Sequence, residues 1–170
     1  EVIPDLLKTL KENNVQITFY VTGRWAEKNP DLLRQMYQDG HEIQNHGYSH
    51  KLCTQNSVET AKDEILKTET VIMELLGVKT NVFAPPSGDY DETTVELCRE
   101  LGYKMVLWSS DTIDWREGST ADVIKARVLK KRLNGAIVLM HPKPETIKAL
   151  PDLIKEIQAQ KIEIVPLYKL

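Results

Sequence analysis

His46 and His50 form the sharpest local pattern in the sequence, two imidazoles four residues apart. If this segment forms a helical turn, positions i and i+4 share one face. Neutral imidazole binds Zn²⁺ at about 2.0–2.1 Å, and a catalytic zinc site normally has three protein ligands and an open position. The pair therefore predicts two ligands of a metal site that needs a third. The alternative is a polar loop in which both histidines only hydrogen-bond to neighbours, because this spacing is common by chance.

Another histidine, His141, follows the most apolar run of the chain, residues 136–140. An ordinary imidazole titrates near neutral pH, which suits a general acid. Asp114 is the candidate carboxylate that would tune it. Two alternatives stay open. His141 could be a satisfied core residue, and Asp111 and Asp114 could cap a loop through Asx turns.

Residues 84–88, Ala-Pro-Pro-Ser-Gly, are expected to form a stiff loop. Pro85 and Pro86 fix backbone torsions, and Gly88 permits a positive φ. The loop is either an ordinary turn or one wall of a substrate groove. Two interpretations of Trp115 also stay open, because its indole could stack on a sugar or belong to the core.

Short apolar runs alternate with longer amphipathic stretches along the whole chain. Strands are expected at 15–21, 41–44, 81–84, 104–108, 136–140 and 162–166. Helices are expected at 2–13, from 30 to a stop at 39–40, and at 57–76, 91–101, 120–133 and 146–160. This alternation predicts a parallel α/β sheet or barrel.

The expected strands make a positional prediction. In parallel α/β folds, functional groups gather where strands end and enter the next loop. His46 and His50 follow one expected strand, the aspartates at 111 and 114 follow another, and His141 follows a third. They are therefore expected at one rim, whereas His41 begins a strand at the opposite end.

Composition sets broad limits. The 170 residues are 41% apolar and 28% charged, with a formal net charge of −3, which indicates one ordinary globular domain over residues 1–170. This charge gives no general attraction to nucleic acid or to an anionic membrane, and no apolar run approaches the roughly 20 residues of a membrane span.

Cys53 and Cys98 fit no zinc or CxxC pattern and are expected as buried thiols, with a disulfide left open. Because the chain begins at Glu1, directly before an expected helix, it is expected to be a fragment.

Four segments in order resemble motifs of one family. They are NHGYSH (45–50), FAPPSG (83–88), DTIDW (111–115) and IVLMH (137–141). They look like four of the five motifs of the polysaccharide deacetylases, carbohydrate esterase family 4, also called the NodB homology domain. ITFYVTG (17–23) is similar to the family's second strand. The resemblance covers essentially the whole chain.

The resemblance implies a deformed (β/α) barrel of parallel strands, of the glycoside hydrolase-deacetylase type. It implies a divalent metal, zinc with cobalt or nickel as alternatives, held by Asp-His-His with His46 and His50 as the two histidines. His141 would be the general acid and Asp114 its partner. The walls of the acetyl and sugar pocket would be Pro85, Pro86, Trp115 and Leu139, and the oxyanion N–H would come from Ser87 or Tyr90.

The same resemblance implies a substrate and a location. Peptidoglycan, chitin-like polymers and acetylxylan are within the family's range, and N- and O-deacetylation stay open. An extracytoplasmic location, secreted or at the cell surface, is expected.

Three departures from the family pattern weigh against activity. The family's first motif, Thr-Phe-Asp-Asp-Gly, supplies the base and third metal ligand and is absent here. The family places it on the strand before the helix expected at 2–13, so this first strand is expected to be missing from the fragment rather than from the protein. Ala84 stands where active members carry an arginine, and Gly47 where they carry Ser or Thr. The first alternative is therefore a degenerate member that binds cell-wall glycan with little or no turnover. The second is an unrelated α/β sugar-binding or isomerase-like module.

Overall fold

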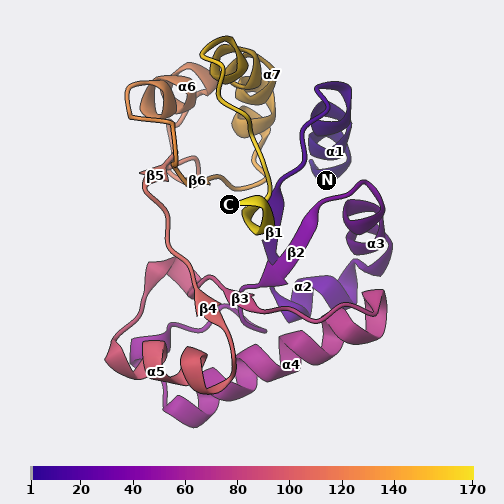
Figure 1. Cartoon of the computed structure of the whole chain (residues 1–170), viewed down its shortest axis with the longest axis vertical. Helices are drawn as coiled ribbons and strands as arrows, with labels where there is room; N and C mark the ends of the chain where they lie inside the picture. Colours follow the sequence, from indigo (N-terminus) through magenta and orange to yellow (C-terminus); the bar gives the residue numbers. More distant parts are fainter. Residues whose placement is uncertain (1) are drawn as a thin grey trace. The chain divides into compact units, whose positions relative to one another are not determined.

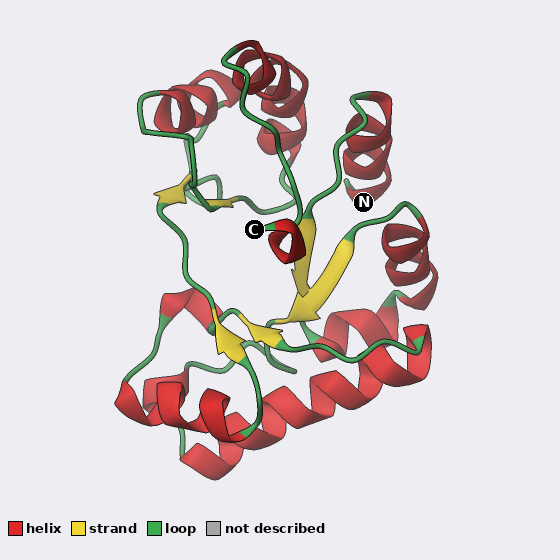
Figure 2. Cartoon of the chain, viewed as in Figure 1, coloured by secondary structure: helices red, strands yellow, loops and turns green. Residues whose placement is uncertain are grey.

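The protein divides into two compact units in a computed structural model that describes residues 2–170 (Figure 1). One unit is Thr18–Leu107. The other combines the residues up to Ile17 with Trp108–Leu170. Each unit contains its own parallel strands and its own helices, as Figure 2 shows by colour.

The Thr18–Leu107 unit is built on a four-stranded parallel sheet in the order β1-β2-β3-β4. These strands are β1 (Thr18–Val21), β2 (Glu42–Asn45), β3 (Val82–Phe83) and β4 (Lys104–Met105). Thr18 pairs with Glu42, Asn45 with Phe83 and Phe83 with Met105. Parallel neighbours need a crossover connection, usually a helix, and the predicted alternation of strand and helix is confirmed here.

Four helices belong to this unit: α2 (Gly23–Lys28), α3 (Pro30–Gln38), α4 (Val58–Leu76) and α5 (Glu92–Glu100). Pro30 occupies the first turn of α3, where a missing N–H costs nothing. Ser57 caps α4 by accepting from the N–H of Thr60, and Gly77 ends it at a φ of 71°. The long helix α4 contacts both α2 and α5 (Figure 1).

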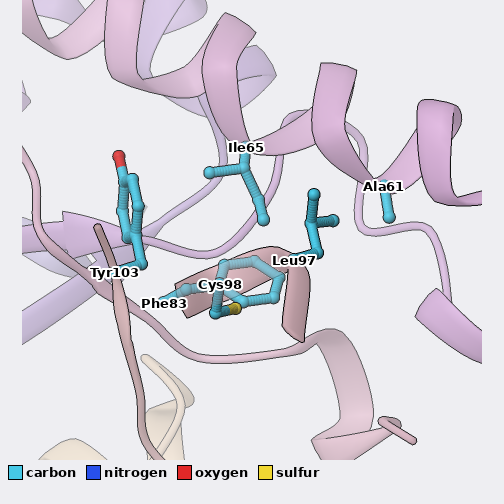
Figure 3. Packing of buried hydrophobic residues seen from close by; sticks show 6 residues of the cluster. All are labelled: Ala61, Ile65, Phe83, Leu97, Cys98 and Tyr103. Carbon is cyan, nitrogen blue, oxygen red and sulfur yellow. The ribbon is translucent and has the colours of Figure 1, made fainter. Parts of the chain in front are cut away.

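Beneath this sheet, α4 and α5 enclose an apolar cluster (Figure 3). Its members are Ala61, Ile65, Phe83, Leu97, Cys98 and Tyr103. Cys53 packs against this cluster, and both cysteines are free thiols as predicted, with Cys98 buried and Cys53 half-buried. Burial raises the pKa of each thiol to about 11, so both remain protonated at neutral pH.

The other unit contains a two-stranded parallel pair and three helices. The elements are α1 (Ile3–Glu12), β5 (Ser110–Asp111), α6 (Ala121–Leu129), β6 (Val138–Leu139) and α7 (Pro144–Ala159). Ser110 pairs with Val138, and α7 contacts both α1 and α6. Val128, Leu133, Leu153 and Ile157 form the apolar cluster of this unit.

Several predicted elements need correction. The segment 162–166 is not a strand in the described structure. Ile162 and Ile164 instead pack their side chains against the Val128 cluster, so the apolar alternation reflects burial rather than backbone pairing. Sequence reasoning missed α2, which is too short to show a helical period, and placed β5 inside a loop.

None of the helices among residues 2–170 combines the length and apolar composition needed to cross a membrane.

Gly23, the first residue of α2, allows an unusually close approach. A β-carbon there would lie 2.6 Å from Cδ2 of Tyr48 and 2.8 Å from Oγ1 of Thr68. Because glycine allows this close approach, the N–H of Gly23 donates to the carbonyl of Gly47 at 3.0 Å. The N–H of Arg24 donates to the carbonyl of Tyr48, also at 3.0 Å. The unpaired N–H groups that begin a helix therefore hold the segment between His46 and His50.

Replacing Gly23 with alanine is expected to lower the free energy of unfolding by about 2–3 kcal/mol, because the added carbon forces packed neighbours apart. Gly102→Ala is the matched comparison. Its β-carbon would meet no atom within 4 Å, so only the positive φ opposes the change, at about 1 kcal/mol. Urea denaturation measures both, and a Gly23→Ala loss no larger than that of Gly102→Ala would contradict the packing argument.

Candidate active site

The segment from His46 to His50 follows β2 as an irregular loop rather than the helical turn assumed from sequence. His50 has a φ of 62°, in the left-handed region, which cannot continue an α-helix. The two imidazoles nevertheless lie together, with ring centroids 5.0 Å apart and planes at 71°. The loop therefore gathers the two rings that the sequence singled out.

The tautomer of His46 follows from its partner. Its Nδ1 lies 2.6 Å from the carbonyl oxygen of Ala84. A carbonyl oxygen can only accept, so Nδ1 carries the proton and the lone pair is on Nε2. Metal-binding histidines typically make this second contact through the ring nitrogen that does not bind the ion.

The donor types of this loop fit a divalent ion of the zinc, cobalt or nickel class, for which imidazole is a suitable ligand. His46 and His50 supply two nitrogens. Among residues 2–170 no group of three or more His, Cys, Asp or Glu side chains is placed to hold a metal ion. An ion bound at this loop would therefore have two histidine nitrogens from the described residues and would need at least one further ligand.

Asn45, the last residue of β2, fixes the start of the loop and was not singled out from sequence. Its side chain is fully buried. The Oδ1 accepts from the N–H of Gly47 at 2.9 Å, and the Nδ2 donates to the carbonyl of Ile65 at 2.9 Å and to the hydroxyl of Tyr103 at 3.3 Å. A polar residue ending a buried strand was the available signal.

The proline loop lies beside the histidine loop in the same unit. Pro85 and Pro86 are buried, and Cγ of Pro86 would lie 3.8 Å from a β-carbon at Gly47. Ser87 is exposed with a φ of 57°, and Tyr90 is 44% exposed. The two prolines therefore pack as a rigid support, whereas Ser87 and Tyr90 reach solvent.

In the other unit, Asp114 and His141 form a hydrogen-bonded pair. The Nδ1 of His141 lies 2.7 Å from Oδ1 of Asp114. The Oδ2 of the same carboxylate accepts from the backbone N–H of His141 at 2.6 Å and from the hydroxyl of Thr146 at 2.7 Å. The Asp114 side chain is completely buried, whereas that of His141 is 40% exposed.

These contacts decide the charge of Asp114. Burial alone would raise the pKa of its carboxyl, but the hydrogen bonds from the His141 ring, the His141 N–H and Thr146 outweigh burial and lower it. The carboxylate is therefore ionised at neutral pH and holds the proton of His141 on Nδ1. The arrangement suits an imidazole that exchanges protons through Nε2.

The loop that carries Asp114 is held by Arg127, which sequence reasoning also missed. The guanidinium donates to the carbonyl of Thr112 at 2.8 Å and to the hydroxyl of Ser119 at 3.0 Å. Ile113 has a φ of 52°, a true outlier for a β-branched residue. The Oδ1 of Asp111 accepts the N–H of Ile113 at 2.8 Å, so the Asx-turn alternative is confirmed for that aspartate.

Two further predicted site residues belong to this unit. Trp115 is 55% exposed, with the guanidinium of Arg116 5.4 Å from its ring centroid. The core alternative for Trp115 is therefore wrong. Leu139 is half-buried in β6, and its carbonyl accepts from the hydroxyl of Thr112 at 2.9 Å.

Comparison with known proteins decides the family. A family profile described as polysaccharide deacetylase matches residues 1–106. The chain belongs to this family. A Bacillus subtilis relative, uncharacterized protein YlxY, is 35% identical over 93% of this chain and 49% of its own length. A peptidoglycan-N-acetylglucosamine deacetylase of Bacillus cereus is 32% identical over 98% of this chain and 62% of its own length. The chain therefore spans less than two thirds of these relatives.

Solved structures of polysaccharide deacetylase family members confirm the fold. BA3943 of Bacillus anthracis, described as a CE4 family pseudoenzyme, matches with a TM-score of 0.95 and 32% identity, over 99% of this chain and 60% of that chain. The Bc1960 peptidoglycan N-acetylglucosamine deacetylase matches with a TM-score of 0.96 and 30% identity, over 99% and 81%. The predicted deformed (β/α) barrel of parallel strands is thereby confirmed.

The Asp114→Asn variant tests whether the ionised Asp114 carboxylate stabilises the fold, because that stabilisation depends on pH. Because the pKa of Asp114 is lowered on folding, its ionised form stabilises the fold above the unfolded value of about 3.9, and this stability is lost as pH falls through the folded value. The variant should be less stable than the wild type at pH 6, and the difference should shrink below about pH 4. Urea denaturation between pH 6 and pH 3 measures it, with the exposed Asp152→Asn as control. A difference that stays constant over this range would refute the assignment.

Proposed function

We propose that this chain is the catalytic domain of a metal-dependent hydrolase that removes acetyl groups from a cell-wall polysaccharide. The Asp114–His141 pair carries the proposal. A buried, ionised carboxylate that accepts three hydrogen bonds and orients a half-exposed imidazole is an arrangement for proton transfer. The family relationship supplies the reaction class, and the proposed domain extends over residues 1–170.

Each site residue has a defined role in this proposal. His46 and His50 hold the divalent ion, taken as zinc with cobalt or nickel as alternatives. When bound, such an ion polarises the acetyl carbonyl and lowers the pKa of a water molecule. His141, oriented by Asp114, protonates the leaving amine, and the N–H of Ser87 or Tyr90 donates to the oxyanion. Trp115 and Leu139 contact the sugar and its acetyl group, and the buried Pro85 and Pro86 support the loop that presents Ser87 and Tyr90.

The proposed substrate is acetylated peptidoglycan. Relatives from Bacillus cereus and Listeria monocytogenes are named for deacetylation of peptidoglycan N-acetylglucosamine, and one from Bacillus subtilis for deacetylation of peptidoglycan N-acetylmuramic acid. A net charge of −3 suits a glycan better than a nucleic acid. Such a substrate places the proposed activity outside the cytoplasm, in secreted or surface-attached protein.

Acetate release from peptidoglycan and from N-acetylglucosamine oligomers tests the function. The full-length protein, supplied with Zn²⁺ or Co²⁺, is expected to release acetate. His141→Gln should lower kcat by about 10²–10⁴-fold, because general acid catalysis contributes on that order, and His50→Ala should abolish metal-dependent release. Release by the wild type that does not exceed that of His50→Ala would refute the proposal.

A degenerate family member is the second candidate, and Ala84 favours it. The family resemblance expects arginine at this position, and BA3943, a structural neighbour, is described as a pseudoenzyme. A mutant of BA3943 is described as having restored enzymatic activity, which shows that substitution can recover catalysis on this fold. In this account the chain binds cell-wall glycan with little turnover.

Ala84→Arg in the full-length protein separates the two accounts. If the chain is degenerate, the wild type binds Zn²⁺ without releasing acetate, and the new guanidinium restores measurable release by orienting a carboxylate. Ala84→Met is the matched control, because it adds a long side chain without the charged fork. Wild-type acetate release equal to that of Ala84→Arg would exclude the degenerate account.

A further inference from the structure

One carboxylate holds the residue that lies directly before His50. Glu64 of α4 accepts the backbone N–H of Ser49 on Oε2 at 2.6 Å and the Ser49 hydroxyl on Oε1 at 2.7 Å. Both oxygens of Glu64 are thus bonded to a single residue between the two imidazoles. Charge-assisted bonds of this kind are shorter and stronger than neutral ones, and two of them together fix orientation.

Glu64 is itself held on a rigid element. Its side chain is 11% exposed, and the ammonium of Lys51 lies 3.9 Å from Oε1. The next residue of α4, Ile65, is completely buried and accepts from Asn45 through its carbonyl. The hydroxyl of Thr68 donates to the backbone carbonyl of Glu64 at 2.9 Å. The carboxylate therefore extends from the packed face of the longest helix.

The rest of the loop shows why Ser49 matters most. Gly47 is fixed by Asn45 and Gly23, and Tyr48 by the N–H of Arg24. The Tyr48 ring also lies 3.6 Å from the ammonium of Lys67. Ser49 donates both its backbone N–H and its hydroxyl to Glu64, and it precedes a residue in a costly left-handed conformation.

We propose that Glu64 is a positioning residue for the metal site, whose carboxylate keeps the His50 imidazole beside that of His46. This rests on the proposed function, in which both rings hold a divalent ion. Glu64 acts through the loop rather than as a ligand, because among residues 2–170 no third His, Cys, Asp or Glu side chain joins the two imidazoles as a possible metal-binding group. Residues that orient metal ligands in this way typically change metal affinity by about 10–100-fold when removed.

Glu64→Gln in the full-length protein is the direct test. Glutamine keeps the shape of the side chain but removes its negative charge, and because the Ser49 hydroxyl can also accept, at most two neutral hydrogen bonds to Ser49 remain. Titration calorimetry with Zn²⁺ should show about 10–100-fold weaker binding. The matched control is Glu74→Gln, an exposed position on the same helix, which should bind Zn²⁺ as the wild type does.

Ser49→Ala provides a second, independent variant. It removes the hydroxyl bond and keeps the N–H bond, so its loss of Zn²⁺ affinity should be smaller than that of Glu64→Gln. The double variant should lose no more than Glu64→Gln alone, because the two residues act as one unit. Circular dichroism checks that each variant is folded, and if Glu64→Gln fails to fold, Ser49→Ala carries the comparison.

Amide hydrogen exchange without metal separates this inference from the proposed function. At Ser49, Glu64→Gln should exchange about tenfold faster than the wild type, because a charge-assisted hydrogen bond to this amide is replaced by a weaker neutral one. Unchanged exchange together with unchanged Zn²⁺ affinity would overturn the positioning role and leave the proposed function standing. Faster exchange in a protein whose wild type binds no Zn²⁺ would sustain the loop-positioning role and overturn the proposed metal site.

Discussion

The buried amide of Asn45 is the interaction on which the histidine loop and its surroundings depend. Its side chain joins the end of β2 to the carbonyl of Ile65 in α4 and to the hydroxyl of Tyr103, while its Oδ1 anchors Gly47. Its own carbonyl accepts the N–H of Ala84 at 3.0 Å. Because an unpaired buried amide is costly, these segments must adopt one arrangement together. The proline loop and histidine loop are therefore set by the same residue.

Left-handed backbone at non-glycine residues occurs in three of the predicted site loops and also at Asn14 and Lys161, outside those loops. His50, Ser87 and Ile113 have φ values of 62°, 57° and 52°. Such conformations persist only where surrounding contacts enforce them. Glu64 supplies those contacts next to His50, and Arg127 supplies them around Ile113. A charged side chain from a helix thus stabilises a strained loop in each unit.

Sequence predicted the elements well and their supporting contacts poorly. The periodicity of residues 57–76 and the cap at Ser57 were enough to place α4, because both signals are local. The histidines and Asp114 were proposed as site residues from residue type and their position after strands. Asn45, Glu64 and Arg127 were missed because they act on residues up to 58 positions away. Residues 162–166 were wrongly predicted as a strand. Alternation of apolar and polar residues indicates that one face of a segment is buried, and a segment buried in this way need not pair its backbone with another strand.

The three hydrogen bonds on Asp114 limit how His141 can handle protons. The Nδ1 of the ring is hydrogen-bonded to a completely buried carboxylate, so protons can be exchanged only through Nε2. Proton donation to a leaving group and proton uptake from solvent must then alternate at Nε2. In the proposed reaction, the imidazole has to regain its proton after each release of the amine, and its 40% exposed side chain can take that proton from water.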